Sequence, residues 1–410
     1  MADHRTTADP ATADDWHGCN PLSESFRDDP YPSLHHLRET HPVDQTPLGT
    51  WRVSRHADID DLLRNGPVRQ TNAAGINPMF DPDDRSPGSF VDFMLNRDGD
   101  PHTRLRKLVF KAFTRRAVEA MQAQVEETVD RAMTQALRDG GLDVIADLAL
   151  PVPASMICKV LGVPEEDRDQ FTQWTQARTN AFFAAMLPPE TRQATRDAGE
   201  ALAAYFDDLI AERRKSLGED LLSELIRVEE DGETLTVAEM IPQVVGLLVA
   251  GFETTIGLIG NGARALIEHP AEREKLLDDP SLIDAAVEEC LRYDNPILMI
   301  WRVLTKPHTI GGITLPADAV VWPMLAAGNR DPRVNPDPDR FDITRTNVSY
   351  HSFGGGSHFC LGHQLAKMEA RIALGELVRR APALAIDYGD VQWSDSFFRV
   401  YGKLPVRFQS

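Results

Sequence analysis

The sequence predicts a mainly α-helical protein with a smaller β portion, built as a single domain around one long helix. The long helix is predicted by a capping box at Thr236 and Glu239, which opens a helical run that reaches about Glu268. Such a helix would be roughly 50 Å long, enough to cross a whole domain. Strand-like segments are few, and no repeat or linker divides the chain after its N-terminal segment.

The remaining elements follow from local patterns. Residues 1–24 are rich in Asp, Ala and Thr, so we expect a flexible polar tail followed by one domain over 25–410. Asp100 and Pro101 form an N-cap and first-turn pair, and apolar residues follow them at helical spacing. Further helices are predicted over 117–138, 165–186, 190–217, 281–293 and 361–381. Strands are predicted over 51–54, 300–304, 319–324 and 404–408.

Composition limits the class of protein. The chain has 410 residues, 42% hydrophobic and 26% charged, as is usual for a soluble globular protein. Its net charge of −20 argues against nucleic acid or an anionic membrane as the main partner. The N-terminus lacks the apolar segment of a signal peptide. The apolar run over 244–259 is shorter than the ~20 residues of a membrane span and contains Glu253, so it indicates a buried helix.

The four cysteines form no CxxC pair, which predicts neither a zinc site nor a disulfide framework and fits a reducing cytoplasm. Cys360 lies in the most informative segment, which runs from Phe353 to Gly362 as FGGGSHFCLG. Backbone N–H groups at the start of the following helix would stabilise its thiolate. Glycines at 354, 355, 356 and 362 would let the backbone approach a flat ligand, and Phe353 would cover the sulfur. An isolated cysteine would be an ordinary buried thiol, but this pattern favours a haem-iron ligand.

This segment resembles the cysteine loop of the cytochrome P450 family, whose pattern is F-G-x-G-x-H-x-C-x-G, and every specified position is met. The resemblance covers nearly everything from about Pro30 to Phe408. It implies the cytochrome P450 fold, with the long helix lying over the haem. It also implies haem b (iron protoporphyrin IX) as the cofactor, with the Cys360 thiolate as the axial iron ligand.

The haem propionates need cationic partners, because two buried carboxylates without partners would be prohibitively costly. The resemblance implies that four side chains bind them. His102 and Arg106 lie four residues apart on one predicted helix face, Arg302 lies on the strand beside the haem, and His358 lies in the cysteine loop. Any one of them alone could be a solvated surface charge, but together they predict a haem clamp.

Glu289 and Arg292 are three apart on one predicted helix and resemble the family's ExxR pair. The resemblance implies a third member from a later meander, for which Arg340 in Pro338-Asp-Arg-Phe341 is the best match. We interpret this triad as structural, since it would lock the segment that carries the cysteine loop.

The segment from Ala250 to Thr254, AGFET, resembles the family's oxygen-activating motif. Ala250 and Gly251 are small enough to let the helix approach the iron face. The Thr254 hydroxyl can bond the Ala250 carbonyl oxygen, four residues earlier. Glu253 and Thr254 are therefore the predicted catalytic pair, because a hydroxyl and a carboxylate together can relay protons to oxygen.

The substrate pocket is expected to be apolar, although each candidate could equally be a core residue. Its candidates are Phe90, Phe93, Phe182, Val245, Leu298, Met299 and Phe397. Together they favour a mainly hydrophobic molecule of moderate size, such as a terpenoid, steroid, fatty acyl or macrolide-like compound, with neutral compounds preferred.

The leading hypothesis is an O2-dependent monooxygenase, a cytoplasmic monomer that inserts one oxygen atom by hydroxylation or epoxidation. We expect electrons from a separate ferredoxin and ferredoxin reductase, because no flavin or nicotinamide domain follows residue 410. A basic cluster could dock the ferredoxin or could be a solvated helix face, and it consists of Arg104, Lys107, Lys111, Arg115, Arg116 and Lys367. Two alternatives stay open: a peroxide-driven or redox-neutral haem-thiolate enzyme, and a non-catalytic haem-binding protein.

Overall fold

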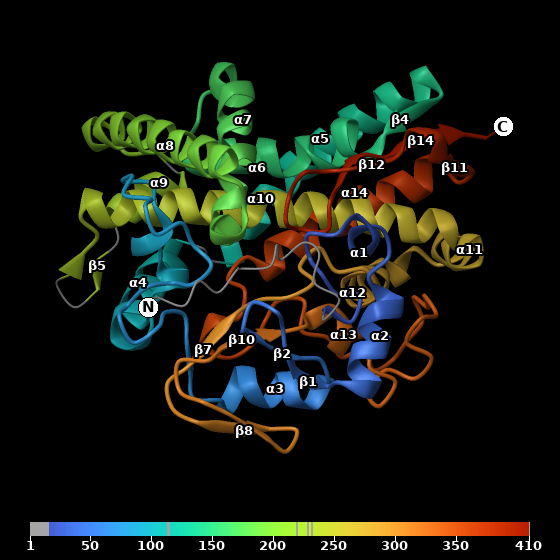
Figure 1. The fold of residues 1–410 in the computed structure, drawn as a ribbon. Helices are drawn as coiled ribbons and strands as arrows, with labels where there is room; N and C mark the ends of the chain where they lie inside the picture. The colour runs from blue at the N-terminus through green and yellow to red at the C-terminus, as the bar shows by residue number, and fades with distance from the viewer. Residues whose placement is uncertain (1–15, 113–114, 219, 228, 231–232, 410) are drawn as a thin grey trace.

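A long helix, α10 (Val237–Glu268), crosses the centre of the protein, as Figure 1 shows for the computed structural model. The structure describes residues 16–112, 115–218, 220–227, 229–230 and 233–409. The predicted capping box begins α10: the Glu239 N–H donates to the Thr236 hydroxyl (3.2 Å), and the Thr236 N–H donates to the Glu239 carboxylate (3.0 Å). The predicted fold class, mainly α with a smaller β portion, is confirmed.

The other α-helices are arranged around α10. In chain order they are α1 (Glu24–Asp28), α2 (Tyr31–Thr40), α3 (His56–Asn65), α4 (Gly99–Ala112), α5 (Arg115–Asp139), α6 (Pro151–Leu161), α7 (Arg168–Thr179), α8 (Pro189–Lys215), α9 (Leu221–Arg227), α11 (Pro270–Asp278), α12 (Ile283–Tyr293), α13 (Leu325–Asn329) and α14 (His363–Arg380). The shorter helical turns are η2 (Phe90–Asp92), η3 (Met94–Asn96), η4 (Val144–Ala149), η5 (Glu165–Asp167), η6 (Asn180–Met186), η7 (Pro280–Leu282), η8 (Gly356–His358) and η9 (Tyr388–Asp390). The sequence predicted the long helices well but missed α1, α2, α3, α6, α9, α11 and α13.

The largest sheet has the strand order β1-β2-β10-β7-β3. Its strands are β1 (Val43–Gln45), β2 (Trp51–Val53), β3 (Val68–Arg69), β7 (Arg302–Leu304) and β10 (Val320–Pro323), and only the β2–β10 pair is parallel. A three-stranded sheet joins β4 (Gly141–Asp143), β11 (Leu384–Ile386) and β14 (Pro405–Phe408). Two-stranded pairs join β5 (Glu229–Glu230) to β6 (Glu233–Thr234), β8 (His308–Ile310) to β9 (Ile313–Leu315), and β12 (Gln392–Trp393) to β13 (Tyr401–Lys403).

The core surrounds α10, which packs against α6, α7, α8 and α14, while the five-stranded sheet and α3 lie on the other side of it (Figure 1). Two apolar helical stretches, 144–161 and 237–268, are long enough to cross a membrane by length and composition. Their most apolar windows are 61% and 78% buried inside the protein. Burial of that extent is typical of core helices in a soluble protein, as predicted for the second of them.

The expectation of a loose tail over 1–24 is wrong for its last part. Trp16 and Cys19 are buried in the main core, and the Trp16 ring stacks on Trp322 of β10. The Trp16 carbonyl also accepts a hydrogen bond from Arg52 of β2 (2.9 Å). The polar composition of the N-terminal segment gave no sign of this packing. Two apolar side chains, Trp16 and Cys19, are enough to anchor the segment to the core. Residues 1–15 lie outside the described residues.

Candidate active site

A mainly apolar cavity of about 290 Å³ lies between α10, α6, the start of β7 and the cysteine loop. The side chains that line it come from segments far apart in the sequence. All eight residues predicted to contact the cofactor line this one cavity: His102, Arg106, Ala250, Arg302, Phe353, His358, Cys360 and Gly362. The predicted spacing therefore corresponds to a real convergence in space.

Cys360 is held in a tight loop directly before α14. Its backbone N–H donates to the carbonyl oxygen of Phe353 (3.0 Å), and Gly354 makes the turn possible with a φ of +70°. The N–H groups of Gly362 and His363 donate to the sulfur. Burial raises the pKa of the Cys360 thiol, whereas these N–H groups and the nearby Arg106 guanidinium act to lower it. The loop thus aims a thiol into the cavity and provides donors for its thiolate form.

The loop glycines have different roles, which corrects part of the prediction. A Cβ at Gly356 would lie 2.2 Å from the carbonyl oxygen of Leu63 in α3, and one at Gly355 would lie 3.1 Å from the Leu63 Cβ. These two glycines therefore allow close packing of the loop on α3. A Cβ added at Gly362, or at Gly251 in α10, would meet no atom of another segment within 4 Å, and both glycines line the cavity. They leave room for a flat ligand between them.

Four nitrogen-bearing side chains gather at one end of the cavity. The imidazole rings of His102 and His358 lie 4.2 Å apart between centroids, and His358 contacts the Asp98 carboxylate (3.3 Å). Arg106 donates to the carbonyl oxygen of Phe359 (2.7 Å). Burial and the neighbouring His358 and Arg106 lower the pKa of His102 to about 4.

The cluster is short of negative charge. Arg302 is 6% exposed, and burial lowers its pKa to about 10 although Asp98 attracts it. The Nδ1 atom of His358 is buried and has no hydrogen-bond partner among the described residues. A ligand bearing carboxylates would satisfy these groups and reverse their desolvation cost. The donor set therefore fits the two propionates of a haem.

The wall opposite Cys360 comes from α10. The Thr254 hydroxyl donates to the carbonyl oxygen of Ala250 (2.7 Å), as predicted. Thr254, Ala250 and Gly251 all line the cavity. Glu253 does not line the cavity, and its side chain is buried, since the residue is 7% exposed. Burial raises the pKa of Glu253 to about 7, and the hydroxyls of Thr179 and Ser396 partly oppose this rise.

The predicted substrate residues divide into two groups. Phe93, Phe182 and Met299 line the cavity. Phe90, Val245, Leu298 and Phe397 do not, which corrects the prediction for these four. Phe90 lies behind Phe93 and Phe182 and packs against both rings, whereas Val245 is fully buried in the core. Leu298 and Phe397 line a neighbouring pocket of about 30 Å³.

Several lining residues were missed. α6 contributes Pro153, Met156, Ile157, Val160 and Leu161, and Pro151 at its first turn could have revealed this helix. Trp301 lines the cavity beside Arg302, and its indole N–H has no hydrogen-bond partner among the described residues. Glu369 of α14 also lines it, and burial raises the pKa of its carboxyl to about 8.

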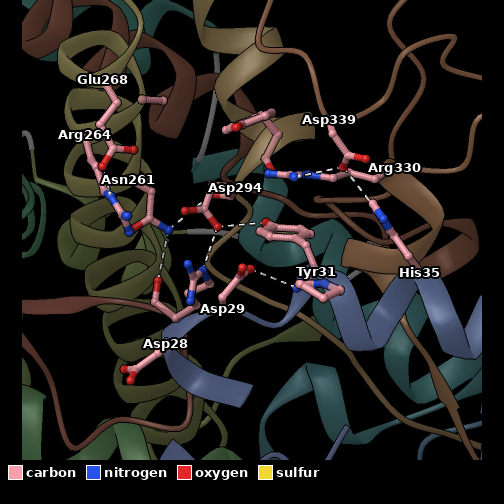
Figure 2. Close-up of a pocket in the computed structure, with 14 residues that line it drawn as sticks. Asp28, Asp29, Tyr31, His35, Asn261, Arg264, Glu268, Asp294, Arg330 and Asp339 are labelled. Atoms are coloured by element: carbon pink, nitrogen blue, oxygen red, sulfur yellow. Dashed lines mark hydrogen bonds and ion pairs between the residues drawn. The ribbon is translucent and has the colours of Figure 1, made fainter. Parts of the chain in front are cut away.

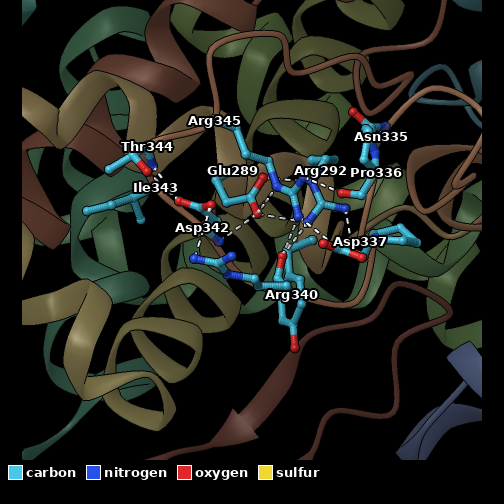
Figure 3. Close-up of polar contacts among 12 residues, drawn as sticks. Glu289, Arg292, Asn335, Pro336, Asp337, Arg340, Asp342, Ile343, Thr344 and Arg345 are labelled. Carbon is cyan, nitrogen blue, oxygen red and sulfur yellow. Dashed lines mark hydrogen bonds and ion pairs between the residues drawn. The ribbon is translucent and has the colours of Figure 1, made fainter.

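The Glu289–Arg292 pair is present, but its third member is Arg345 and not the predicted Arg340 (Figure 3). Arg292 binds Glu289 through two hydrogen bonds of 2.6 and 2.8 Å, and both side chains are fully buried. Arg345 donates to the same carboxylate (3.1 Å). Arg340 offers only its carbonyl oxygen, while its side chain is 61% exposed and lies near Asp342. The meander turns at residue 340, so the side chain that returns to Glu289 comes five residues later.

Comparison with known proteins identifies the family. The cytochrome P450 family model matches residues 70–382. The chain is 37% identical to cytochrome P450 monooxygenase PikC of Streptomyces venezuelae, over 98% of this chain and 96% of that protein. It is also 37% identical to vitamin D(3) 25-hydroxylase of Pseudonocardia autotrophica, over 90% of each. This chain belongs to the cytochrome P450 family.

Solved structures agree with this assignment of a cytochrome P450. The fold is similar to P450BioI in complex with an acyl carrier protein ligated to hexadec-9Z-enoic acid, with a TM-score of 0.86 at 32% identity over 94% of this chain and 99% of that one. It is also similar to CalO2, with a TM-score of 0.87 at 31% identity over 95% and 98%. As a cytochrome P450, the protein is a monooxygenase that uses haem with a cysteine thiolate ligand.

In this cytochrome P450, Cys360 would hold the iron, and the cluster of His102, Arg106, Arg302 and His358 would bind the propionates. When bound, a thiolate-ligated haem supplies oxygen-activating chemistry, because the thiolate pushes electron density onto the iron. The chain itself excludes bulk water with apolar walls, and its helix α10 contributes Thr254, with its hydroxyl, to the cavity lining. The buried carboxyl of Glu253, whose pKa burial raises to about 7, lies outside the cavity lining.

A second cavity, of about 520 Å³, shares no lining residue with the first (Figure 2). Its polar groups bind one another. The Asp294 carboxylate accepts from the Tyr31 hydroxyl (2.8 Å) and from Arg399 (2.7 Å). The Arg330 guanidinium lies 3.3 and 3.9 Å from the ring centres of Tyr31 and Tyr293. This cluster pins the N-terminal helices to α10 and α12, which is a structural role in the P450 fold.

Proposed function

We propose that this cytochrome P450 hydroxylates or epoxidises a neutral, mainly hydrophobic molecule of moderate size. The observation that carries the proposal is the chemistry of the cavity wall remote from the clamp. Most of the described residues that line the cavity are apolar or aromatic, and they include Leu247, Leu248, Phe182, Phe183 and Phe398. Apolar walls of this kind bind ligands mainly by burying apolar surface.

One polar group among the lining residues, next to Arg302 of the clamp, narrows the substrate class. The buried indole N–H of Trp301 has no partner among the described residues, and an unsatisfied buried donor costs free energy that a ligand acceptor would recover. We therefore favour a substrate that carries a carbonyl, ester or hydroxyl oxygen on an apolar skeleton. The names of relatives such as 6-deoxyerythronolide B hydroxylase and vitamin D(3) 25-hydroxylase support macrolactones and sterols as the first compounds to test.

We propose haem b as the cofactor. The sequence has four separate cysteines and no CxxC pair, so a covalent c-type attachment has no motif to use. The propionate clamp and the thiol of Cys360, which line the same cavity, also support haem as the cofactor.

We propose a ferredoxin and its reductase as the electron source. Lys107 is exposed on α4, next to the cavity end that holds Arg106. Two members of the predicted basic cluster are engaged elsewhere, because Arg104 pairs with Glu239 (2.7 Å) and Lys367 pairs with Glu288 (2.5 Å). The side chains of Lys111, Arg115 and Arg116 lie outside the described residues. The docking surface thus depends on fewer free cations than the sequence implied.

The proposed catalytic pair is Glu253 and Thr254, supported by the hydroxyl of Thr254 in the cavity and the protonatable carboxyl behind it.

A cytoplasmic location and a monomeric state stay predictions. The domain proposed over 25–410 is extended to residue 16, because Trp16 and Cys19 pack into its core.

A spectroscopic titration of the ferric protein tests the substrate proposal. The panel sets macrolactones and sterols against fatty acids and aromatic acids, and the spin state of the haem is followed. We expect saturable high-spin shifts with the neutral compounds, and turnover of the same compounds with NADH, ferredoxin and reductase. Shifts with carboxylic acids alone would refute the neutral-substrate proposal, and product formation with peroxide but not with the redox partners would favour the peroxide-driven alternative.

A further inference from the structure

Gln70 lines the same cavity as the propionate clamp, which consists of His102, Arg106, Arg302 and His358. The sequence gave no reason to include it among the cofactor-binding residues. The residue is 1% exposed, and its side-chain nitrogen is buried without a hydrogen-bond partner among the described residues. Because a buried amide donor without an acceptor costs free energy, a ligand that brings an acceptor to it would be stabilised.

The largest sheet places Gln70 opposite Arg302. β3 pairs with β7 in antiparallel fashion, with Arg69 opposite Val303, so the residue that follows β3 comes opposite Arg302. Opposite residues in an antiparallel pair point their side chains to the same face of the sheet. Since Arg302 lines the cavity, the Gln70 amide reaches the cavity from the neighbouring segment, on the same face as the guanidinium.

The backbone of Gln70 is held from the side away from β7. Along an antiparallel pair, positions joined by backbone hydrogen bonds alternate with positions that are not. The Thr305 N–H donates to the Pro67 carbonyl oxygen (2.7 Å), so the Gln70–Arg302 position is one without such bonds. The Gln70 N–H therefore points away from β7, and it donates to the Asp98 carboxylate (2.8 Å).

Asp98 connects Gln70 to the clamp. One of its carboxylate oxygens accepts the Gln70 N–H, and the other lies 3.3 Å from the Nε2 atom of His358. Its charge also attracts Arg302. Because one carboxylate holds both segments, the Gln70 backbone and the His358 ring keep a fixed position relative to each other.

The cations of the clamp are too few for two propionates. Among the described residues that line the cavity, the cationic ones are Arg106 and Arg302. His102 is neutral at neutral pH, since burial and its neighbours lower its pKa to about 4. Two propionates and Asp98 would together bring three negative charges to two positive ones. Neutral N–H donors are therefore needed, and a glutamine amide supplies two N–H groups.

We propose that Gln70 is a further donor of the propionate clamp, and that its side-chain amide binds a haem propionate next to Arg302. Asp98 is then a positioning residue, because it fixes the backbone from which the amide extends. The propionate gives the buried amide a charged acceptor, and hydrogen bonds to ionised groups are stronger than those between neutral groups. The inference rests on the proposed haem b, which carries the propionates, and does not depend on the proposed substrate.

The test compares Gln70→Leu, which removes both N–H groups at similar volume, with the matched control Gln243→Leu. Gln243 is fully buried in α10 outside the cavity lining, and its amide donates to the Asp92 carbonyl oxygen (2.8 Å). For each holoprotein, the rate of porphyrin transfer to excess apomyoglobin is measured with haem b and with etiohaem, an iron porphyrin that has no carboxylates. Resonance Raman spectra record the propionate bending bands of the haem b forms.

We expect Gln70→Leu to release haem b about tenfold faster than the wild type, the size of effect that one hydrogen bond to a charged group gives. Its propionate band should shift, while its etiohaem rate should stay as in the wild type. Gln70→Glu places a carboxylate against the propionate and should release haem b faster still. Gln70→Lys keeps a donor on a side chain of similar length and should restore the slow rate. Gln243→Leu should change the rates of both porphyrins by the same factor, because it affects only the fold.

Wild-type release of haem b and a wild-type propionate band in Gln70→Leu or Gln70→Glu would overturn the inference. An equal acceleration for haem b and etiohaem in Gln70→Leu would overturn it too, since Gln70 would then act through packing. So would a loss in Gln70→Lys as large as in Gln70→Leu. Equal rates for haem b and etiohaem in the wild type would instead refute the propionate clamp as a whole, which distinguishes a failure of the proposed cofactor site from a failure at Gln70.

Discussion

The Nε atom of Arg345 lies 3.1 Å from the Oε1 atom of Glu289, a carboxylate that is fully buried. The same oxygen accepts from Arg292 and from the Asp342 N–H (2.9 Å), so one acid joins α12 to the chain that leads into the cysteine loop. Arg345 also donates to the Pro336 carbonyl oxygen (2.6 Å), and its side chain thereby connects two positions of the same meander, nine residues apart.

Arg345→Ala should destabilise the protein by about 3 kcal/mol, because it removes one partner of a buried carboxylate. Arg340→Ala is the matched control, since the Arg340 side chain is 61% exposed and should change stability by less than about 0.5 kcal/mol. Urea unfolding followed by haem absorbance measures both. We also expect Glu289→Ala and Arg292→Ala to give haem-free, misfolded protein.

Equal losses in the Arg340 and Arg345 variants would contradict the assignment of Arg345. Normal haem content in Glu289→Ala would contradict the structural role of the whole triad.

Thr254→Ala should keep oxygen reduction running but divert it to hydrogen peroxide. The variant removes the Thr254 hydroxyl from the cavity lining. Glu253 does not line the cavity, so it cannot replace this hydroxyl there. We expect product per NADH to fall by about tenfold or more, within the range for loss of a positioned proton-transfer group. Product and peroxide are measured together, and Thr254→Ser, which keeps the hydroxyl, serves as control. Tightly coupled turnover by Thr254→Ala would refute this role.

Trp301→Phe should weaken binding of a substrate that offers an oxygen acceptor. The indole N–H is buried without a partner among the described residues, so a ligand oxygen that reaches it gains a hydrogen bond at little extra desolvation cost. We expect the dissociation constant of a keto-macrolactone, measured from the spin-state titration, to rise by about tenfold. An analogue without that oxygen should bind both proteins equally. The same loss for both ligands would show that Trp301 contributes shape and not a hydrogen bond.

The sequence predicted the parts of the site that depend on local spacing. His102 and Arg106 share one helix face, the Thr254 hydroxyl reaches the carbonyl of Ala250, and the loop around Cys360 forms its own turn. Each of these relationships spans only a few residues, so the helical period or the glycine positions determine it.

Relationships that depend on tertiary packing could not be predicted in the same way. Glu253 and Thr254 are neighbours in the chain, but they point to different surroundings, since consecutive helical residues are rotated by about 100°. Phe397 and Leu298 are as apolar as Phe398 and Met299, yet only the latter two line the main cavity. Arg345 replaced Arg340 because the path of an irregular meander sets which side chain turns inward.

Glu253 should make the stability of the protein pH-dependent. Burial raises its pKa from 4.5 to about 7, so the folded state holds the proton more tightly than the unfolded state. Below about pH 4.5 the carboxyl is protonated in both states and its contribution to stability is fully present. As pH rises from 4.5 through 7, the unfolded state loses its proton first, and this contribution is lost. The difference in pKa corresponds to about 3 kcal/mol.

Glu253→Gln stays neutral at every pH and should therefore escape this loss. Relative to the wild type, the free energy of unfolding of the variant should increase by about 3 kcal/mol between pH 4.5 and pH 8. Urea unfolding of the haem-loaded protein at several pH values measures this difference. Glu212→Gln is the control, because the Glu212 side chain is 66% exposed, and it should show no such change. A constant difference between Glu253→Gln and the wild type across this range would mean that the carboxyl is ionised at neutral pH, and it could then not hold the proton that Thr254 is proposed to receive.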